Sequence, residues 1–268
     1  KGTPEKSSYR NYGPVDVKQA MGHSSNVYFW YVALAIAGET YVENQGLDIP
    51  KSAFDTVRRG LAEFGLGRNT GISMENESTG YTGSGYEPGL YLDLAIGQYD
   101  TYTTMQMNQY ISTIANGSRM KINYITSINE PGPINSPGKV ISSFEPKKLN
   151  SLSISNTDLN NIRNYLKEPT KSYGTAHMFS NSKYNPRAKT GTAESFYYKQ
   201  KTHNLSEEIN SSFIGYAPAD NPEIAVSAMV PYQGNASEGA ATICKKIMDY
   251  YFGAKWYIFY MEMIHILF

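Results

Sequence analysis

The sequence predicts a mixed fold of the α/β (α+β) class, in which an antiparallel sheet is flanked by helices. Apolar residues recur at helical spacing through much of the first two thirds of the chain, whereas residues from about 187 to 230 have the pattern of strands. Helices first, then a hairpin, then a closing helix is the order expected when helices pack on such a sheet. With 268 residues, of which 40% are hydrophobic, the chain can bury the core of one domain.

Four helices are expected before the sheet. The first follows Ser24-Ser25-Asn26 and ends at Gly38, because glycine commonly terminates helices. We expect it to be buried through an apolar face made of Val27, Tyr28, Tyr31, Val32, Leu34 and Ala35. The others are expected at 50–64, where proline fits the first turn, at 103–116, where threonine caps the start, and at 156–167.

Residues 65–88, between the second and third of these helices, are rich in glycine and poor in apolar side chains. This composition indicates a long surface excursion. Because long loops in compact domains are often functional, we expect it to form a lid or rim.

Three strands are expected at 187–196, 211–217 and 223–230. The last two are separated only by a short turn-forming run, residues 218–222, so they should be antiparallel neighbours. A final helix over 237–252 would cover the sheet. Its expected inner face consists of Ala240, Ile243, Cys244, Ile247 and Tyr251.

Composition excludes several classes of function. The 24 basic and 24 acidic residues leave no net field to attract nucleic acid, so we expect no nucleic-acid partner. The single Cys244 has no second cysteine with which to form a disulfide or a zinc site, and the four histidines lack metal-ligand spacing. We therefore predict no metal and no cofactor.

The string Lys189-Thr190-Gly191-Thr192 opens the first predicted strand. With no side chain at Gly191, a substrate backbone can lie against the strand while the lysine ammonium and the threonine hydroxyls meet a carboxylate. The alternative is that the glycine only marks a bulge or a close backbone approach.

Ser24-Ser25-Asn26 is, alone, typical of a helix cap. Together with Lys-Thr-Gly it supplies two of the three motifs of penicillin-binding proteins and related serine β-lactamases, in the same order. Further segments, at 23–28, 94–98, 113–117 and 212–218, extend this similarity. From about residue 11 to 252 the chain resembles the transpeptidase domain of class B penicillin-binding proteins. The resemblance implies an active site in a groove between the sheet and a helical lobe.

The resemblance also implies roles for individual residues. Ser24, Asn26 and Lys189 would be catalytic: Ser24 relays a proton, Asn26 holds the substrate amide, and Lys189 supplies positive potential. Substrate binding would fall to Ser25, Thr190, Gly191 and Thr192, with the Thr192 N–H in the oxyanion hole.

The partners implied by the resemblance are peptidoglycan stem peptides, β-lactam antibiotics and, for the intact protein, cell-division or elongation proteins. The implied location is the extracytoplasmic face of the bacterial cytoplasmic membrane, with the anchor in an upstream segment.

One motif of the family is not found. Its nucleophile is the serine of Ser-x-x-Lys, which precedes Ser-x-Asn, whereas the strings that begin at Ser136 and Ser180 follow it. Neither pattern predicts the helix start that would bring the serine and lysine together. We therefore expect residues 1–252 to be a partial transpeptidase domain, truncated at its N-terminus. Residues 253–268 form an off-pattern apolar tail, shorter than the roughly 20 residues that span a bilayer.

Three functions stay open at this point. The first is a D,D-transpeptidase that is inactive without its serine, the second a non-catalytic sensor of β-lactams or cell-wall peptides, and the third a relative of serine β-lactamases. All three require the strand beginning at Lys189 to face the turn that bears Ser24 and Asn26.

Overall fold

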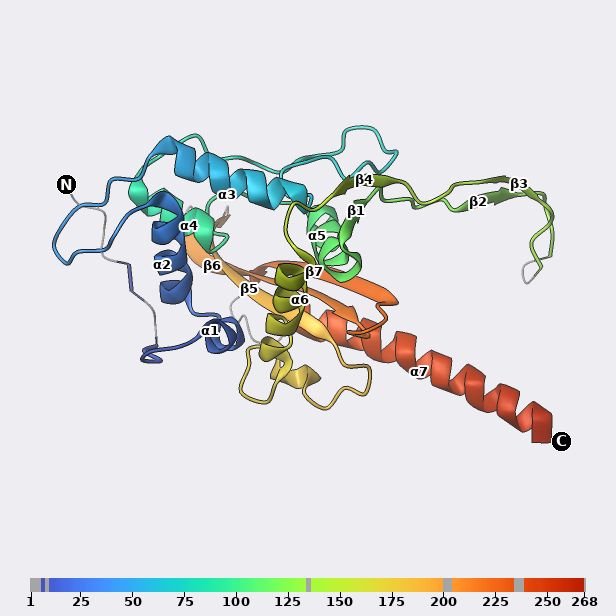
Figure 1. Ribbon diagram of the computed structural model, residues 1–268. Coiled ribbons are helices and arrows are strands. Elements are labelled where there is room, and N and C mark those ends of the chain that lie inside the picture. Colours follow the sequence, from blue (N-terminus) through green and yellow to red (C-terminus); the bar gives the residue numbers. More distant parts are fainter. Residues whose placement is uncertain (1–5, 8–9, 134–135, 200–203, 234–238, 268) are drawn as a thin grey trace.

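A three-stranded antiparallel sheet forms the centre of the fold (Figure 1). The computed structural model describes residues 6–7, 10–133, 136–199, 204–233 and 239–267, with side chains left out at 196–205 and 254–267. The strands are β5 (Arg187–Lys199), β6 (Asn204–Ala217) and β7 (Ile224–Gln233), in the spatial order β5-β6-β7. The predicted strands are confirmed, and β5 and β6 extend further than expected.

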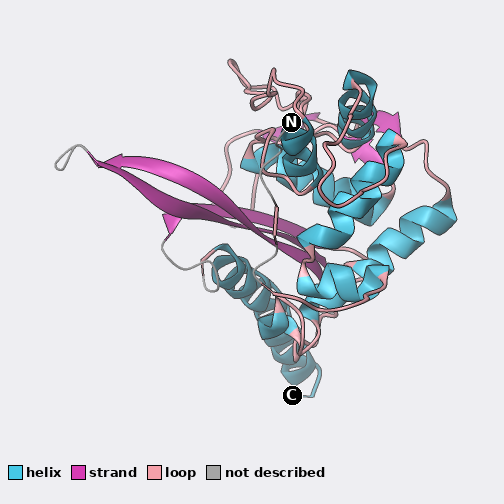
Figure 2. Ribbon diagram, turned by 90° about the vertical axis from the view of Figure 1, so that its left-hand side faces the viewer, coloured by secondary structure: helices cyan, strands magenta, loops and turns pink. Residues whose placement is uncertain are grey.

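The hairpin of β5 and β6 projects beyond the end of β7 (Figure 2). β6 pairs with β7 from Ala217 to Ile209, whereas its pairing with β5 continues to Asn204. The outer part of the hairpin is therefore a two-stranded ribbon.

Helices cover both faces of the sheet. In the described part of the chain they are α1 (Val17–His23), α2 (Asn26–Ala37), α3 (Lys51–Glu63), α4 (Pro88–Ala95), α5 (Thr104–Asn116), α6 (Asn156–Tyr165) and α7 (Ala240–Leu267). Neighbouring strand residues point to opposite faces. Phe213 packs in a core cluster with Cys244 and Met248 of α7, while Ile214 packs with Ile111 of α5. The sheet thus lies between α7 on one side and α5, with α6, on the other.

A separate core cluster holds α2, α3 and α4 together as a helical lobe beside the sheet. Phe54 of α3 and Tyr91 of α4 are fully buried in it, and their ring centroids are 5.0 Å apart. The Tyr91 hydroxyl donates to the carbonyl of Ala33 in α2 at 3.0 Å. A buried polar group with a partner avoids the cost of desolvation, so this contact helps to fix α4 against α2.

The buried face predicted for α2 is mostly wrong, since Leu34 alone among its predicted members is buried. The helix buries Trp30, Ala33 and Leu34, while the exposed fractions of Tyr31 and Val32 are 54% and 40%. The helix is apolar almost all round, so periodicity could not indicate a direction, and packing on α3 and α4 chose the face.

The inner face predicted for α7 is only partly right. Ala240 and Cys244 are buried as expected, but Ile243 and Ile247 are each 45% exposed. Met248 packs against the sheet instead, in the same core cluster as Cys244.

Several elements were not predicted. α1 and α4 are short helices, and 118–151 contains two small antiparallel pairs. These pairs join β1 (Ser118–Met120) to β4 (Lys148–Ser151) and β2 (Ser127–Asn129) to β3 (Val140–Ser143). Two short 3-10 helices, η1 (Glu168–Thr170) and η2 (His177–Phe179), precede the sheet.

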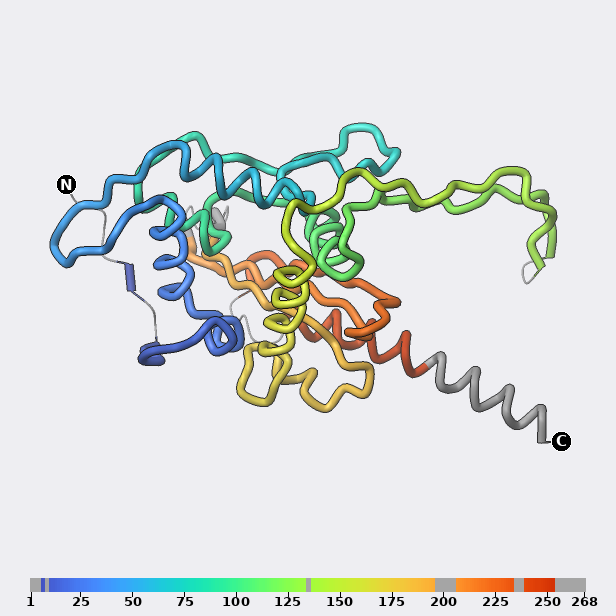
Figure 3. Tube along the Cα trace, viewed as in Figure 1, coloured from blue at the N-terminus to red at the C-terminus, as the bar shows by residue number. Residues whose placement is uncertain are grey.

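The expected apolar tail lies largely outside the residues whose side chains are described, which end at 253 (Figure 3). In the described part of the chain, no helix combines the length and the apolar character needed to cross a membrane.

Candidate active site

Lys189 of β5 meets Ser24, from the turn between α1 and α2. The lysine Nζ donates to Ser24 Oγ at 2.7 Å and to the carbonyl oxygen of Thr190 at 2.7 Å. The two motifs expected to face each other are therefore in direct contact, although they are 165 positions apart in the sequence.

The turn that carries Ser24 is shaped by two adjoining helix ends. Asp16 begins α1 with a capping box, and Ser24 ends it with a left-handed backbone, φ 55°. Ser25 begins α2, where its Oγ accepts from the backbone N–H of Tyr28 at 3.4 Å. Since both neighbouring helices fix the backbone, the Ser24 hydroxyl is held at a defined position. Ser25 is buried and serves as a cap, so its expected contact with substrate stays a prediction.

An aromatic stack supports the same turn. The His23 ring lies between those of Tyr12 and Tyr173, with centroid distances of 4.3 Å and 5.3 Å. Such stacks stabilise beyond the area that they bury. His23 therefore has a structural role next to Ser24.

Burial changes the acidity of Lys189. Removal from water disfavours the charged ammonium and lowers the pKa of Lys189 to about 8. The group is still mainly protonated at neutral pH, where it donates to Ser24. A partly desolvated cation favours binding of a carboxylate.

The hydroxyl of Thr190 is also held in place. Its Oγ1 donates to Thr175 Oγ1 at 2.7 Å, and the Thr175 backbone N–H donates to the carbonyl of Gly22 at 3.1 Å. Thr175 therefore links α1 to β5. No motif in the sequence signals this residue.

Gly191 leaves room for a neighbouring strand. A Cβ at this position would lie 2.3 Å from the Oγ of Ser212, its partner on β6. The close approach that the sequence suggested is thus present, but toward β6. A further approach by a substrate stays a prediction.

Asn26 and Thr192 complete the set of predicted residues. Asn26 is half-buried at the start of α2, and Thr192 is exposed on β5. Among the residues that the structure describes, neither side chain has a hydrogen-bond partner, so both are available to a ligand.

Comparison with known proteins identifies the family of this site. Residues 2–249 match the family described as "Penicillin binding protein transpeptidase domain". The chain belongs to this penicillin-binding transpeptidase family. Penicillin-binding protein 2A of Bacillus subtilis is 38% identical over 256 residues, which cover 93% of this chain and 36% of that protein. The peptidoglycan D,D-transpeptidase MrdA of Haemophilus influenzae is 26% identical over 267 residues, 90% of this chain and 37% of that protein.

A solved structure supports the same assignment. Penicillin-binding protein 2B of Streptococcus pneumoniae strain R6 superposes with a TM-score of 0.78 at 32% identity, over 89% of this chain and 39% of that one. The helices and the antiparallel sheet are thus those of a transpeptidase domain. The chain spans little more than a third of the length of the relatives that it matches.

No Ser-x-x-Lys string of the described chain lies at a helix start in this transpeptidase domain. One of them, Ser118 to Lys121, was not predicted and begins strand β1. Ser136 and Lys139 lie in the distal part of the hairpin formed by β2 and β3. Ser180 follows η2, and Lys183 lies in a turn. In the described part of the chain, no hydrogen bond joins either serine to Ser24 or Lys189.

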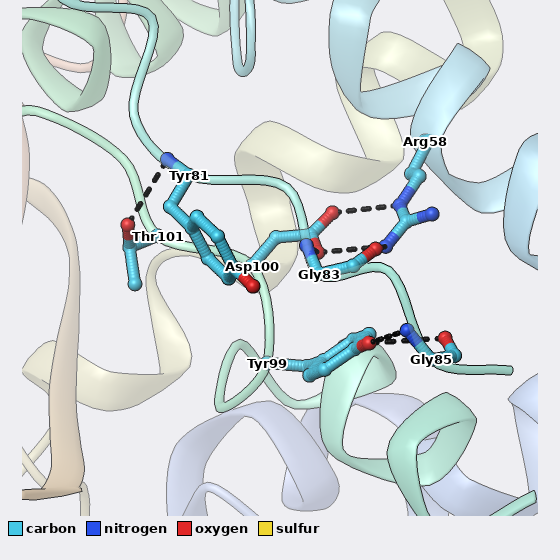
Figure 4. A network of polar contacts seen from close by, with 7 residues as sticks. All are labelled: Arg58, Tyr81, Gly83, Gly85, Tyr99, Asp100 and Thr101. Carbon is cyan, nitrogen blue, oxygen red and sulfur yellow. Dashed lines mark hydrogen bonds and ion pairs between the residues drawn. The ribbon is translucent and has the colours of Figure 1, made fainter. Parts of the chain in front are cut away.

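The glycine-rich excursion of the transpeptidase domain is tied down by a polar network (Figure 4). Buried Asp100 accepts from Arg58 Nε at 2.8 Å and from the Gly83 N–H at 2.9 Å. The Tyr99 hydroxyl contacts both the N–H and the carbonyl of Gly85, at 2.7 Å and 3.0 Å. Residues 65–87 are a loop, as predicted. These bonds make it a fixed support for the segment after α4.

That segment reaches the sheet through Gln98. Its Oε1 accepts from the backbone N–H of Glu194 in β5 at 3.0 Å. Gln98 lies in a segment that resembles the family, but nothing in the sequence shows that it contacts the strand.

Proposed function

We propose that the chain forms the Ser24 and Lys189 side of the active site of a peptidoglycan D,D-transpeptidase. The observation that carries this proposal is the hydrogen bond from Lys189 Nζ to Ser24 Oγ, at 2.7 Å, beside an open strand edge. Membership of the transpeptidase family and similarity to a named D,D-transpeptidase support it.

The substrate is a stem peptide that ends in D-Ala-D-Ala, and a β-lactam takes its place as an inhibitor. Lys189 and Thr192 bind its terminal carboxylate through an ammonium and a hydroxyl, and the Thr190 hydroxyl joins them by turning its proton from Thr175 to the ligand. Asn26 binds the peptide amide. The N–H of Thr192 forms one half of the oxyanion hole.

The reaction passes through an acyl-serine. The serine oxygen attacks the penultimate D-Ala carbonyl, the bond to the terminal D-Ala breaks, and its amine leaves with a proton relayed through Ser24. An amine of a second peptide then attacks the ester, forming the cross-link and restoring the serine hydroxyl.

The attacking serine comes, in this proposal, from a Ser-x-x-Lys helix outside these 268 residues. Support comes from the three Ser-x-x-Lys strings of the chain, since none starts a helix and, among the described residues, no hydrogen bond joins any of their serines to Ser24 or Lys189. The longer protein carries the activity, and this chain alone is not acylated.

Labelling with a fluorescent penicillin tests the proposal. We expect the longer protein to carry a covalent label on a denaturing gel and the 268-residue chain to remain unlabelled. The Lys189→Ala variant of the longer protein should be acylated at least about tenfold more slowly, because a charged hydrogen bond is lost. A labelled band from the chain alone would place the nucleophile inside it.

Product analysis separates the transpeptidase from the two other functions. A sensor would be labelled but would form no cross-linked dimer from stem peptides, and a β-lactamase would release hydrolysed penicillin within minutes. We expect cross-linked product and a stable acyl-enzyme.

A further inference from the structure

β5 has a free edge that is capped at two places. Among the described strands, β5 pairs with β6 on one side and with no strand on the other. On its other side, the N–H of Ala188 donates to the carbonyl of Leu166 at 3.0 Å. Further along, the N–H of Glu194 donates to Gln98 Oε1, also at 3.0 Å.

Only a short stretch of this edge is open between the caps. Along an antiparallel edge strand, outward N–H groups recur at every second residue. Those between Ala188 and Glu194 are therefore the N–H groups of Thr190 and Thr192. Among the described residues, neither has an acceptor. They lie one repeat apart, about 7 Å, so the edge can pair with little more than one residue of a ligand.

Gln98 is held rigidly enough to act as a cap. Gly97 turns the chain at the end of α4 with φ +81°, and the Gln98 N–H donates to the carbonyl of Asp93 at 2.8 Å. The next two residues, Tyr99 and Asp100, belong to the network that anchors the loop (Figure 4). The side chain of Gln98 is therefore presented to β5 from a backbone fixed on both sides.

The direction of a bound peptide follows from the charges. Its carboxylate binds at the Lys189 end of the open stretch. A peptide antiparallel to β5 then runs with its N-terminal part toward Glu194. The first carbonyl beyond the open stretch would meet the N–H of Glu194, which Gln98 already occupies.

We propose that Gln98 is a positioning residue that closes the outer end of the peptide groove, so that the acyl donor pairs with Thr190 and Thr192 and leaves the strand before Glu194. The inference rests on the proposed function, because it requires a peptide carboxylate to bind along β5. In this proposal, Gln98 determines how many residues of the stem peptide form backbone hydrogen bonds with β5.

Two variants test the proposal in the 268-residue chain. Gln98→Ala removes the acceptor, and the matched Gln98→Glu keeps one. The probes are two peptides ending in D-Ala-D-Ala: the N-acetylated dipeptide, and an N-acetylated pentapeptide that adds backbone carbonyls. In Gln98→Ala we expect the affinity for the pentapeptide relative to the dipeptide to rise roughly 3- to 10-fold, because the freed N–H gains a ligand acceptor. Gln98→Glu should keep the ratio of the unaltered chain.

Amide hydrogen exchange at Glu194, followed by NMR, measures the cap itself. The exchange should be faster in Gln98→Ala and restored in Gln98→Glu. The inference would be overturned if the pentapeptide-to-dipeptide affinity ratio were equal in all three proteins. It would also be overturned if the Glu194 amide exchanged at the same rate in all three. Failure of both peptides to bind any of the three would count against the proposed function instead, and the exchange rates would still show whether Gln98 caps the strand.

Discussion

At the scale of single residues, the site depends on the acidity of Lys189. Its pKa of about 8 results from burial, and its bond to Ser24 connects two motifs that no local pattern relates. The sequence indicated both motifs but not the positive φ of Ser24 or the contribution of Thr175. Those features arise from the meeting of α1, α2 and β5, and packing between distant segments leaves no periodic signal.

The lowered pKa of Lys189 predicts a pH-dependent stability. Unfolded lysine has a pKa of about 10.4, so between about pH 8 and 10 the unfolded chain binds more protons than the folded one, and stability rises with pH. We expect the free energy of unfolding of the chain to gain about 1–2 kcal/mol from pH 7.5 to 9.5 relative to Lys189→Met. Urea unfolding at both pH values measures this. Parallel pH profiles of the two proteins would contradict it.

At the scale of elements, the helices and strands with clear caps or apolar periods in the sequence are the ones that can be predicted. α5 was predicted from its threonine cap and its apolar stripe, and the structure shows the capping box between Thr103 and Gln106. The sheet was predicted because β5, β6 and β7 are close in sequence. α1 and α4 span 7 and 8 residues, too short for a clear period, and the face of α2 could not be chosen in an apolar helix.

The glycine-rich loop contains a position where no other residue fits. Gly80 has φ +80°, and a Cβ there would lie 2.0 Å from the carbonyl oxygen of Thr101. We expect Gly80→Ala to lower the free energy of unfolding by about 2–4 kcal/mol, since it combines backbone strain with a clash. Gly38→Ala is the control, because φ is +72° with open space around it, and should lose only about 1 kcal/mol. Similar losses for both, in urea titrations, would show that the clash is relieved at no cost.

At the scale of the whole molecule, the helical lobe presents an apolar surface on α2. Tyr31, Val32 and Ile36 are 54%, 40% and 49% exposed, next to exposed Tyr41. Contiguous apolar surface of this kind promotes association. The apolar spacing along the helix predicts Tyr31 and Val32 in the core, so only the folded chain reveals this surface.

Charge placed on this surface should improve solubility without unfolding the protein. Ile36→Lys is expected to reduce the binding of a hydrophobic dye and the self-association seen in sedimentation, with the free energy of unfolding changed by no more than about 0.5 kcal/mol. Leu34→Lys, at a position that is 5% exposed, should cost at least about 3 kcal/mol. If Ile36→Lys also unfolded the chain, the exposed face of α2 would have to be buried against another part of the protein, and the prediction would be wrong.

The capped edge of β5 has a consequence for the molecule as a whole that is independent of catalysis. An uncovered strand edge is a template on which other chains can add strands, and long ones lead to amyloid. Between Ala188 and Glu194, the caps contributed by Leu166 and Gln98 leave room for barely one peptide unit. Such an opening admits a small ligand but is too short to seed a fibril, so along this stretch of β5 the two capping residues also hinder the addition of a strand from another chain.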